Sequence, residues 1–116
     1  MVFPRIAAVP LLAVSLAVAV WPAAASDASV KITSPTDGAR IDRVELIKLV
    51  FETDPGPNGD HVHIYADGKE VGIVRELEGS FTFGELRPGP HTLCVKLVDK
   101  AYMPVGAEQC IKVRVR

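Results

Sequence analysis

Two of the three histidines in this 116-residue sequence, His61 and His63, lie two positions apart in the segment GDHVHIYADGKE. The segment alternates like a β-strand, so both imidazoles should lie on one side of it, about 7 Å apart between Cα atoms. Paired imidazoles are ligands for copper and zinc, and a third ligand could come from a neighbouring strand. The same histidines could instead be ordinary side chains on the solvent-facing side of a sheet. Which interpretation holds depends on the elements that position them.

The two cysteines, Cys94 and Cys110, fall in the last two alternating segments of the chain. Aligning the apolar faces of these segments as antiparallel neighbours puts Leu93 opposite Ile111 and Cys94 opposite Cys110. Directly opposed cysteines are close enough to bond, and two cysteines in an exported protein usually pair. We therefore predict a Cys94–Cys110 disulfide that closes a loop of about fifteen residues and contributes about 3 kcal/mol. Reduced cysteines could instead add thiolate ligands to the histidine pair.

The first 25 residues have the pattern of an export signal and not of a folded element. Arg5 gives a short positive start, Ile6 to Val20 is apolar, and Ala23 to Ala25 offers the small residues that a signal peptidase reads. The apolar run is shorter than a membrane span, and Pro10 interrupts it. We therefore expect a periplasmic or secreted protein with no membrane span after cleavage, in which residues 26–116 form one domain.

The mature chain consists of short apolar–polar alternations separated by glycine and proline turns, which is typical of a β-sandwich or a β-barrel. The stretch 46–51 could also be a helix, but its β-branched neighbours and the rhythm of the other segments favour a strand. The pattern predicts seven strands, at residues 29–33, 44–51, 61–66, 70–75, 80–83, 91–98 and 109–115.

The dipeptide Asp67-Gly68 is a strong signal for a two-residue β-hairpin turn. Such a turn pairs Ile64 with Val71, which gathers the aliphatic side chains of both strands on one face. That face should be the core face. His61, His63 and Tyr65 then lie on the opposite face and point away from the core.

This pattern resembles bacterial immunoglobulin-like and fibronectin type III-like sandwiches. The residues that carry the resemblance are VKITSPTDGA at 30–39 and LRPGPHTL at 86–93. In such sandwiches a tyrosine hydroxyl closes a corner near the second motif. His91 stands close to that place, and we expect it to point inward or to cap the corner by a hydrogen bond. The resemblance implies a seven-stranded immunoglobulin-like antiparallel β-sandwich, but it says little about activity.

The run SPTDGA at 34–39, with the alternating strand that ends in Phe51, is also similar to the start of periplasmic copper-resistance C-type proteins. Those proteins bind copper through an amino-terminal histidine and a later histidine near the chain end. Here the mature terminus is predicted as Ser26-Asp27, and Ala101 to Pro104 contains no histidine. This similarity supports the fold and transfers no metal site to this chain.

Composition excludes several classes of function. Thirteen Lys and Arg residues are balanced by fourteen Asp and Glu residues, and no concentrated basic surface for nucleic acid is evident. No nucleophile elbow or phosphate-cradling glycine loop frames the serines, acids and histidines, so we expect no enzyme.

The sequence therefore predicts a small exported, non-enzymatic binding or accessory domain of the bacterial cell envelope, without a cofactor. An envelope or extracellular protein partner could meet the face that carries Tyr65, or Tyr102 and Met103 in the 99–107 loop. The alternative is a periplasmic copper- or zinc-binding protein that uses His61 and His63.

Overall fold

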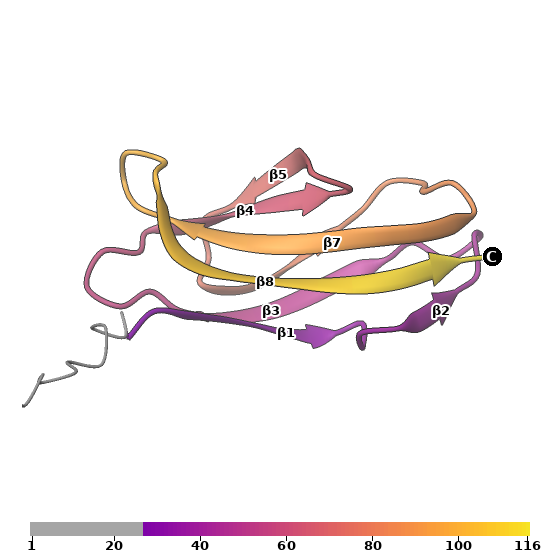
Figure 1. Cartoon of the computed structure of the whole chain (residues 1–116), viewed down its shortest axis with the longest axis horizontal. Helices are drawn as coiled ribbons and strands as arrows, with labels where there is room; N and C mark the ends of the chain where they lie inside the picture. Colours follow the sequence, from indigo (N-terminus) through magenta and orange to yellow (C-terminus); the bar gives the residue numbers. More distant parts are fainter. Residues whose placement is uncertain (1–26) are drawn as a thin grey trace, which may run out of the picture.

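The computed structural model describes residues 27–116, which form two β-sheets packed face to face (Figure 1). The three-stranded sheet has the order β1 (Ser29–Ser34), β3 (Lys48–Asp54), β6 (Glu78–Thr82). The five-stranded sheet has the order β2 (Ala39–Ile41), β8 (Pro104–Val115), β7 (Gly89–Val98), β4 (His61–Ala66), β5 (Lys69–Val74). The predicted all-β sandwich is confirmed.

The predicted export signal lies outside the described residues. Within residues 27–116, no helix is long and apolar enough to cross a membrane.

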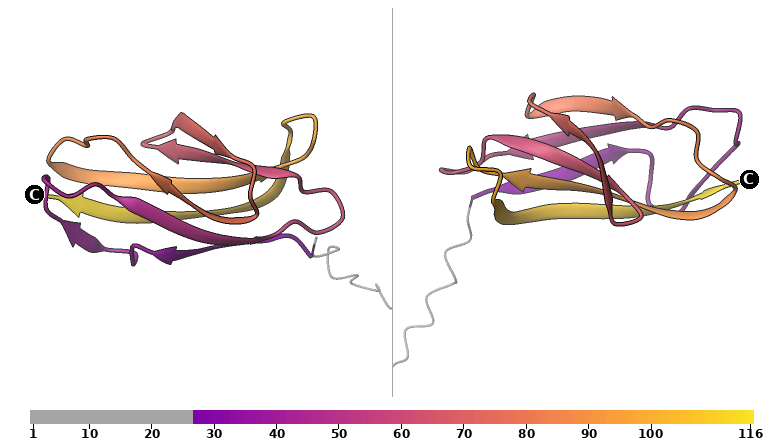
Figure 2. Two further views of the ribbon diagram at one scale, coloured as in Figure 1. Left: turned by 180° about the vertical axis from the view of Figure 1, so that it is seen from behind. Right: turned by 90° about the horizontal axis from the view of Figure 1, so that it is seen from above.

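One strand was not predicted. β2 is only three residues long, too short to show an alternating pattern, and it pairs in parallel with the end of β8. The chain leaves β1 in the first sheet and reaches β2 in the second through a turn at Gly38, which has a positive φ of 86°. The Gly38 amide donates to the Lys112 carbonyl over 2.6 Å, and Asp37 accepts from the Lys112 amide over 2.8 Å. The views in Figure 2 show β2 beside β8 at the end of the sandwich.

The strand predicted at 44–51 begins four residues later, at Lys48. The chain first turns at Asp42, whose carbonyl accepts from the Glu45 amide over 2.8 Å. Val44 and Leu46 lie before the strand and are 86% and 64% exposed. Val44 and Leu46 therefore belong neither to the strand nor to the core.

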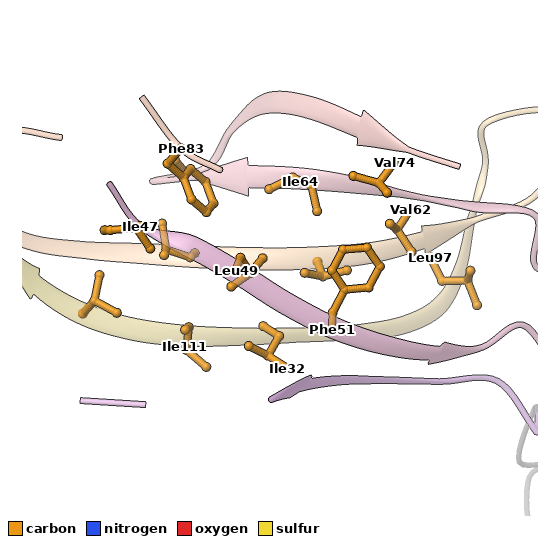
Figure 3. Packing of buried hydrophobic residues seen from close by; sticks show 14 of the residues in the cluster. Ile32, Ile47, Leu49, Phe51, Val62, Ile64, Val74, Phe83, Leu97 and Ile111 are labelled. Atoms are coloured by element: carbon orange, nitrogen blue, oxygen red, sulfur yellow. The ribbon is translucent and has the colours of Figure 1, made fainter. Parts of the chain in front are cut away.

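The core lies between the two sheets and is built from alternate residues of their strands (Figure 3). Phe51 and Leu49 of β3 face Val62 and Ile64 of β4 across the interior, and each is at most 1% exposed. Burying side chains of this size stabilises the fold by about 1.5–3 kcal/mol each. β7 and β8 complete the core with Leu93, Val95, Leu97, Ile111, Val113 and Val115.

The β4–β5 hairpin differs from its predicted register. The turn at Asp67-Gly68 forms as expected, and Tyr65 pairs with Glu70. A β-bulge follows, so Ile64 pairs with Gly72 and not with Val71. The predicted Ile64–Val71 pair is therefore wrong.

Gly72 explains this shift in register. A Cβ atom on Gly72 would lie 2.2 Å from Cε2 of Phe81 in β6, so only glycine lets the ring approach the backbone here. With Gly72 in the core-facing place, Val71 and Ile73 are left 43% and 46% exposed. Val74 is buried in their stead.

Candidate functional site

His61 and His63 lie on the outer face of the five-stranded sheet, as the alternation of β4 predicted. Val62 and Ile64, the residues that alternate with them, belong to the core. The histidines are nevertheless only 1% and 8% exposed, so the expectation of solvent-facing side chains is wrong. Something on the outer face must cover them.

The cover is Tyr102, in the turn that joins β7 to β8. Its ring meets the His61 ring edge-on, with the two centroids 4.8 Å apart and an interplanar angle of 84°. The His63 ring is 5.6 Å from the same phenol ring. The Tyr102 hydroxyl accepts a hydrogen bond from Nη2 of Arg75, just beyond β5, over 3.0 Å. Tyr102 therefore spans the outer face from the β7–β8 turn to the β5 side of the sheet.

The turn holds Tyr102 in this position through Asp99. The Oδ1 atom of Asp99 accepts from the amides of Ala101 and Met103 over 2.8 and 2.9 Å. Its backbone carbonyl accepts from the Tyr102 amide over 3.0 Å. Tyr102 adopts a left-handed φ of 64°, which is costly for a bulky residue and which these bonds support.

The two imidazoles form the centre of a chain of four polar side chains. Nε2 of His61 lies 3.1 Å from Nε2 of His63. Nδ1 of His61 lies 2.9 Å from Oδ2 of Asp60, and Nδ1 of His63 pairs with the carboxylate of Glu70. Each imidazole thus faces a carboxylate with one nitrogen and the other imidazole with its second nitrogen.

This chain has an unusual proton requirement. Each of its three contacts needs one hydrogen as a hydrogen bond, whereas two neutral imidazoles carry only two N–H groups. If both Nδ1 atoms donate to the carboxylates, the two Nε2 lone pairs face each other. A buried lone pair without a partner is unfavourable. The arrangement is complete when a positive species, a proton or a metal ion, lies between the two Nε2 atoms.

Asp60 and Glu70 were not predicted as partners of the histidines, although a signal for each was present. Asp60 is the residue before His61. Glu70 lies opposite Tyr65 in the hairpin register, next to His63 along the same face. Within residues 27–116, no group of three or more His, Cys, Asp or Glu side chains is placed to hold one metal ion.

The cysteines pair as predicted. Leu93 lies opposite Ile111, and Cys94 is opposite and bonded to Cys110. Because both sulfur atoms are used in the disulfide, the mixed histidine–thiolate site considered above does not form in this structure.

The three residues expected to meet a partner do not form one group. Tyr65 lies further along β4 than the histidines, and the Lys96 ammonium sits 4.5 Å from its ring centroid. That ammonium also approaches Glu108 at 3.7 Å. Tyr102 covers the histidines, and Met103 next to it is 60% exposed.

The third histidine, His91, has a separate role at a corner of the fold. Its Nε2 lies 2.6 Å from the carbonyl oxygen of Arg87, and its Nδ1 lies 2.6 Å from Oδ2 of Asp67. The expectation of a hydrogen-bonded corner residue is confirmed. Burial alone would lower the pKa of His91, but the Arg87 carbonyl and the Asp67 carboxylate outweigh it, and the pKa is raised.

The same corner shifts the aspartate. Burial alone would raise the pKa of Asp67, but the hydrogen bond from the Thr92 amide and the contact with His91 outweigh it, and the pKa is lowered. Both shifts favour the charged forms of the pair.

The fold is similar to that of several solved structures. No protein-family model and no curated protein matches the sequence. Among solved structures, the fibronectin(III)-like modules of Clostridium thermocellum CbhA superpose with a TM-score of 0.65 at 20% identity, over 75% of this chain and 96% of that one. The CARDB domain of a Pyrococcus furiosus protein, solved in complex with di-metal ions, superposes with a TM-score of 0.56 at 14% identity, over 78% and 88%. The described residues form an immunoglobulin-like, fibronectin type III-like β-sandwich.

Proposed function

We propose that this domain is a non-enzymatic accessory module that works outside the cytoplasm and binds a protein partner of the bacterial envelope. The observation that carries the proposal is the similarity of this sandwich to the CbhA fibronectin(III)-like structure, which covers 75% of this chain and 96% of that chain. Such modules act through sites on their surfaces and not through the fold itself.

The disulfide supports the proposed location. Cys94 and Cys110 are bonded across β7 and β8, and bonds of this kind persist in the periplasm or outside the cell, where thiols are not kept reduced. The predicted export signal at residues 1–25 would deliver the chain to such a compartment.

The outer face of the five-stranded sheet is the proposed binding surface. Two exposed apolar side chains lie on it, Ile73 opposite His63 and Tyr102 over the histidines, and Met103 follows Tyr102 in the chain; these three residues, here called the outer patch, are 46%, 50% and 60% exposed. β5 is an edge strand, so its outer backbone groups are free to meet a partner as well. Exposed apolar groups of this kind mark interaction sites more often than isolated surface residues do.

Photo-crosslinking in the export compartment tests this proposal. A photoreactive amino acid replaces Ile73 or Met103 in the full-length chain, and Glu52, an exposed residue of β3 on the other sheet, serves as the matched control. We expect one protein adduct at positions 73 and 103 and none at 52. The affinity of the isolated complex should then fall at least about tenfold in Ile73→Ser. Equal labelling of both sheets, or no adduct at the outer patch, would contradict the proposal.

A further inference from the structure

We propose that His61 and His63 bind one divalent transition-metal ion between their Nε2 atoms, copper in preference to zinc, with Asp60 and Glu70 as positioning residues. This site lies beneath the proposed protein-binding surface and does not depend on it.

The distance between the two Nε2 atoms fits two ligands of one ion. Imidazole nitrogens bind such ions at about 2.0–2.1 Å, so two of them lie about 2.9 Å apart at a right angle and about 3.3 Å apart in a tetrahedron. The observed separation of 3.1 Å lies between these values. Both histidines belong to β4, so the backbone of one strand holds the two side chains next to each other.

The carboxylates orient the imidazoles in the way metal-binding histidines require. A histidine that binds a metal through one nitrogen usually donates from its other nitrogen to a carboxylate or carbonyl, which fixes the tautomer and makes the free nitrogen a better ligand. His61 has this arrangement with Asp60, and His63 has it with Glu70. Both Nε2 atoms are left to face each other with their lone pairs.

The local charge favours a dication. Asp60 and Glu70 place two negative charges at the ends of a chain whose two imidazoles are at most 8% exposed. Two cationic groups on the same face have other partners. Arg75 bonds the Tyr102 hydroxyl, and Lys96, which lies opposite His63 in the β4–β7 register, sits over Tyr65 and near Glu108. A divalent ion between the imidazoles would balance the two carboxylates and supply the positive species that the chain needs.

The donor set selects the class of metal. Two neutral imidazoles suit copper and zinc, whereas calcium and magnesium require oxygen ligands. Among divalent ions that accept imidazole, copper binds more tightly than zinc at a site that does not enforce one geometry. Two protein ligands leave the remaining coordination positions to water or to a donor from a partner.

Metal titration of the purified, disulfide-bonded protein tests the site. We expect calorimetry with Cu(II), and separately with Zn(II), to give one ion per chain and tighter binding of copper. His61→Gln and His63→Gln should each abolish this stoichiometric binding. His91→Gln removes the remaining imidazole, which bonds Asp67 and Arg87 instead, and should leave the binding unchanged. Stoichiometric binding that survives in His61→Gln, or that His91→Gln removes, would overturn the proposal.

A measurement on the unmodified protein guards against variants that fail to fold. Nitrogen-15 NMR of the imidazoles with diamagnetic Zn(II) reports each ring nitrogen separately. We expect the Nε2 signals of His61 and His63 to shift with one equivalent of zinc, while those of His91 stay in place. Unchanged signals at His61 and His63 would mean that a proton alone joins the pair, and the metal site would be rejected.

The positioning role of the carboxylates has its own test. Asp60→Asn and Glu70→Gln keep the size of each side chain but remove its charge, and we expect each to weaken copper binding about 10–100-fold. Glu108→Gln, which neutralises the carboxylate paired with Lys96 on the same face, is the matched control and should change little. Equal affinities in all three variants would show that Asp60 and Glu70 do not position the ligands.

Discussion

Nδ1 of His91 lies 2.6 Å from Oδ2 of Asp67, and this contact joins the start of β7 to the turn of the β4–β5 hairpin. The other carboxylate oxygen of Asp67 accepts from the Thr92 amide over 2.8 Å, and Nε2 of His91 faces the Arg87 carbonyl. Because both ring nitrogens face acceptors, His91 satisfies this corner best as an imidazolium.

The corner should therefore make stability depend on pH. The pKa of His91 is raised from 6.5, so its contribution is complete below pH 6.5 and is lost as the pH rises through the folded value. The pKa of Asp67 is lowered from 3.8, so its contribution is present above pH 3.8 and is lost as the pH falls through the folded value. Both contributions are therefore fully present between pH 3.8 and pH 6.5.

Urea unfolding of wild type and His91→Gln, at pH 6 and at pH 8.5, measures this effect. We expect the variant to lose about 1 kcal/mol at pH 6, because the corner is partly open to solvent and its hydrogen bonds are worth little more. The difference between the two proteins should shrink at pH 8.5. Taking this difference removes any contribution of His61 and His63. A difference that is the same at both pH values would contradict the assignment.

The disulfide between Cys94 and Cys110 makes a second prediction. It links residues 16 positions apart in neighbouring strands, and such a link stabilises mainly by restricting the unfolded chain. Replacing both cysteines by alanine should lower the free energy of unfolding by about 3 kcal/mol, measured by urea denaturation. The wild-type protein unfolded in a strong reductant should behave like the double variant. If reduction leaves the midpoint where it was, the bond does not form in solution.

The cysteine pairing could be predicted because it depends only on local pattern. β7 and β8 are adjacent in the chain, and both alternate strictly, so aligning Leu93 with Ile111 already fixes which residues face each other. The outward direction of His61 and His63 followed from β4 in the same way. Patterns within a strand and between chain neighbours carry this information.

What could not be predicted depends on contacts between distant parts of the chain. The burial of His61 comes from Tyr102, whose place is set by a left-handed backbone and by the bonds of Asp99. No alternation of apolar residues encodes such a turn. The bulge in β5 likewise depends on Phe81, which belongs to the other sheet.

That bulge gives a third prediction. In Gly72→Ala the new methyl group would meet the Phe81 ring at 2.2 Å, and either the ring or the strand must move. We expect a loss of about 1–3 kcal/mol in the free energy of unfolding, measured by urea denaturation. Gly84→Ala is the matched control, because nothing lies within 4 Å of its Cβ position.

Phe81→Leu provides the second half of this test. It removes part of the ring that Gly72→Ala would meet, so the two substitutions together should cost less than the sum of their separate costs. Strict additivity would show that Phe81 does not hold Gly72 in its place.

The cover over the histidine pair gives the last prediction. Tyr102 is 50% exposed itself, while His61 beneath it is 1% exposed, so the phenol ring should restrict the approach of reagents and ions to the imidazoles. Tyr102→Ala should increase the rate at which diethyl pyrocarbonate modifies His61 and His63, and it should speed the binding of Cu(II) measured by stopped flow.

Tyr102→Phe keeps the ring and loses only the hydroxyl that accepts from Arg75. In this variant His61 and His63 should be modified at a rate close to that in wild type, because the ring and not its hydrogen bond excludes the solvent. His91 lies outside the cover, so its own modification rate should be the same in all three proteins. If Tyr102→Ala leaves the rates at His61 and His63 unchanged, access to the pair does not pass through Tyr102.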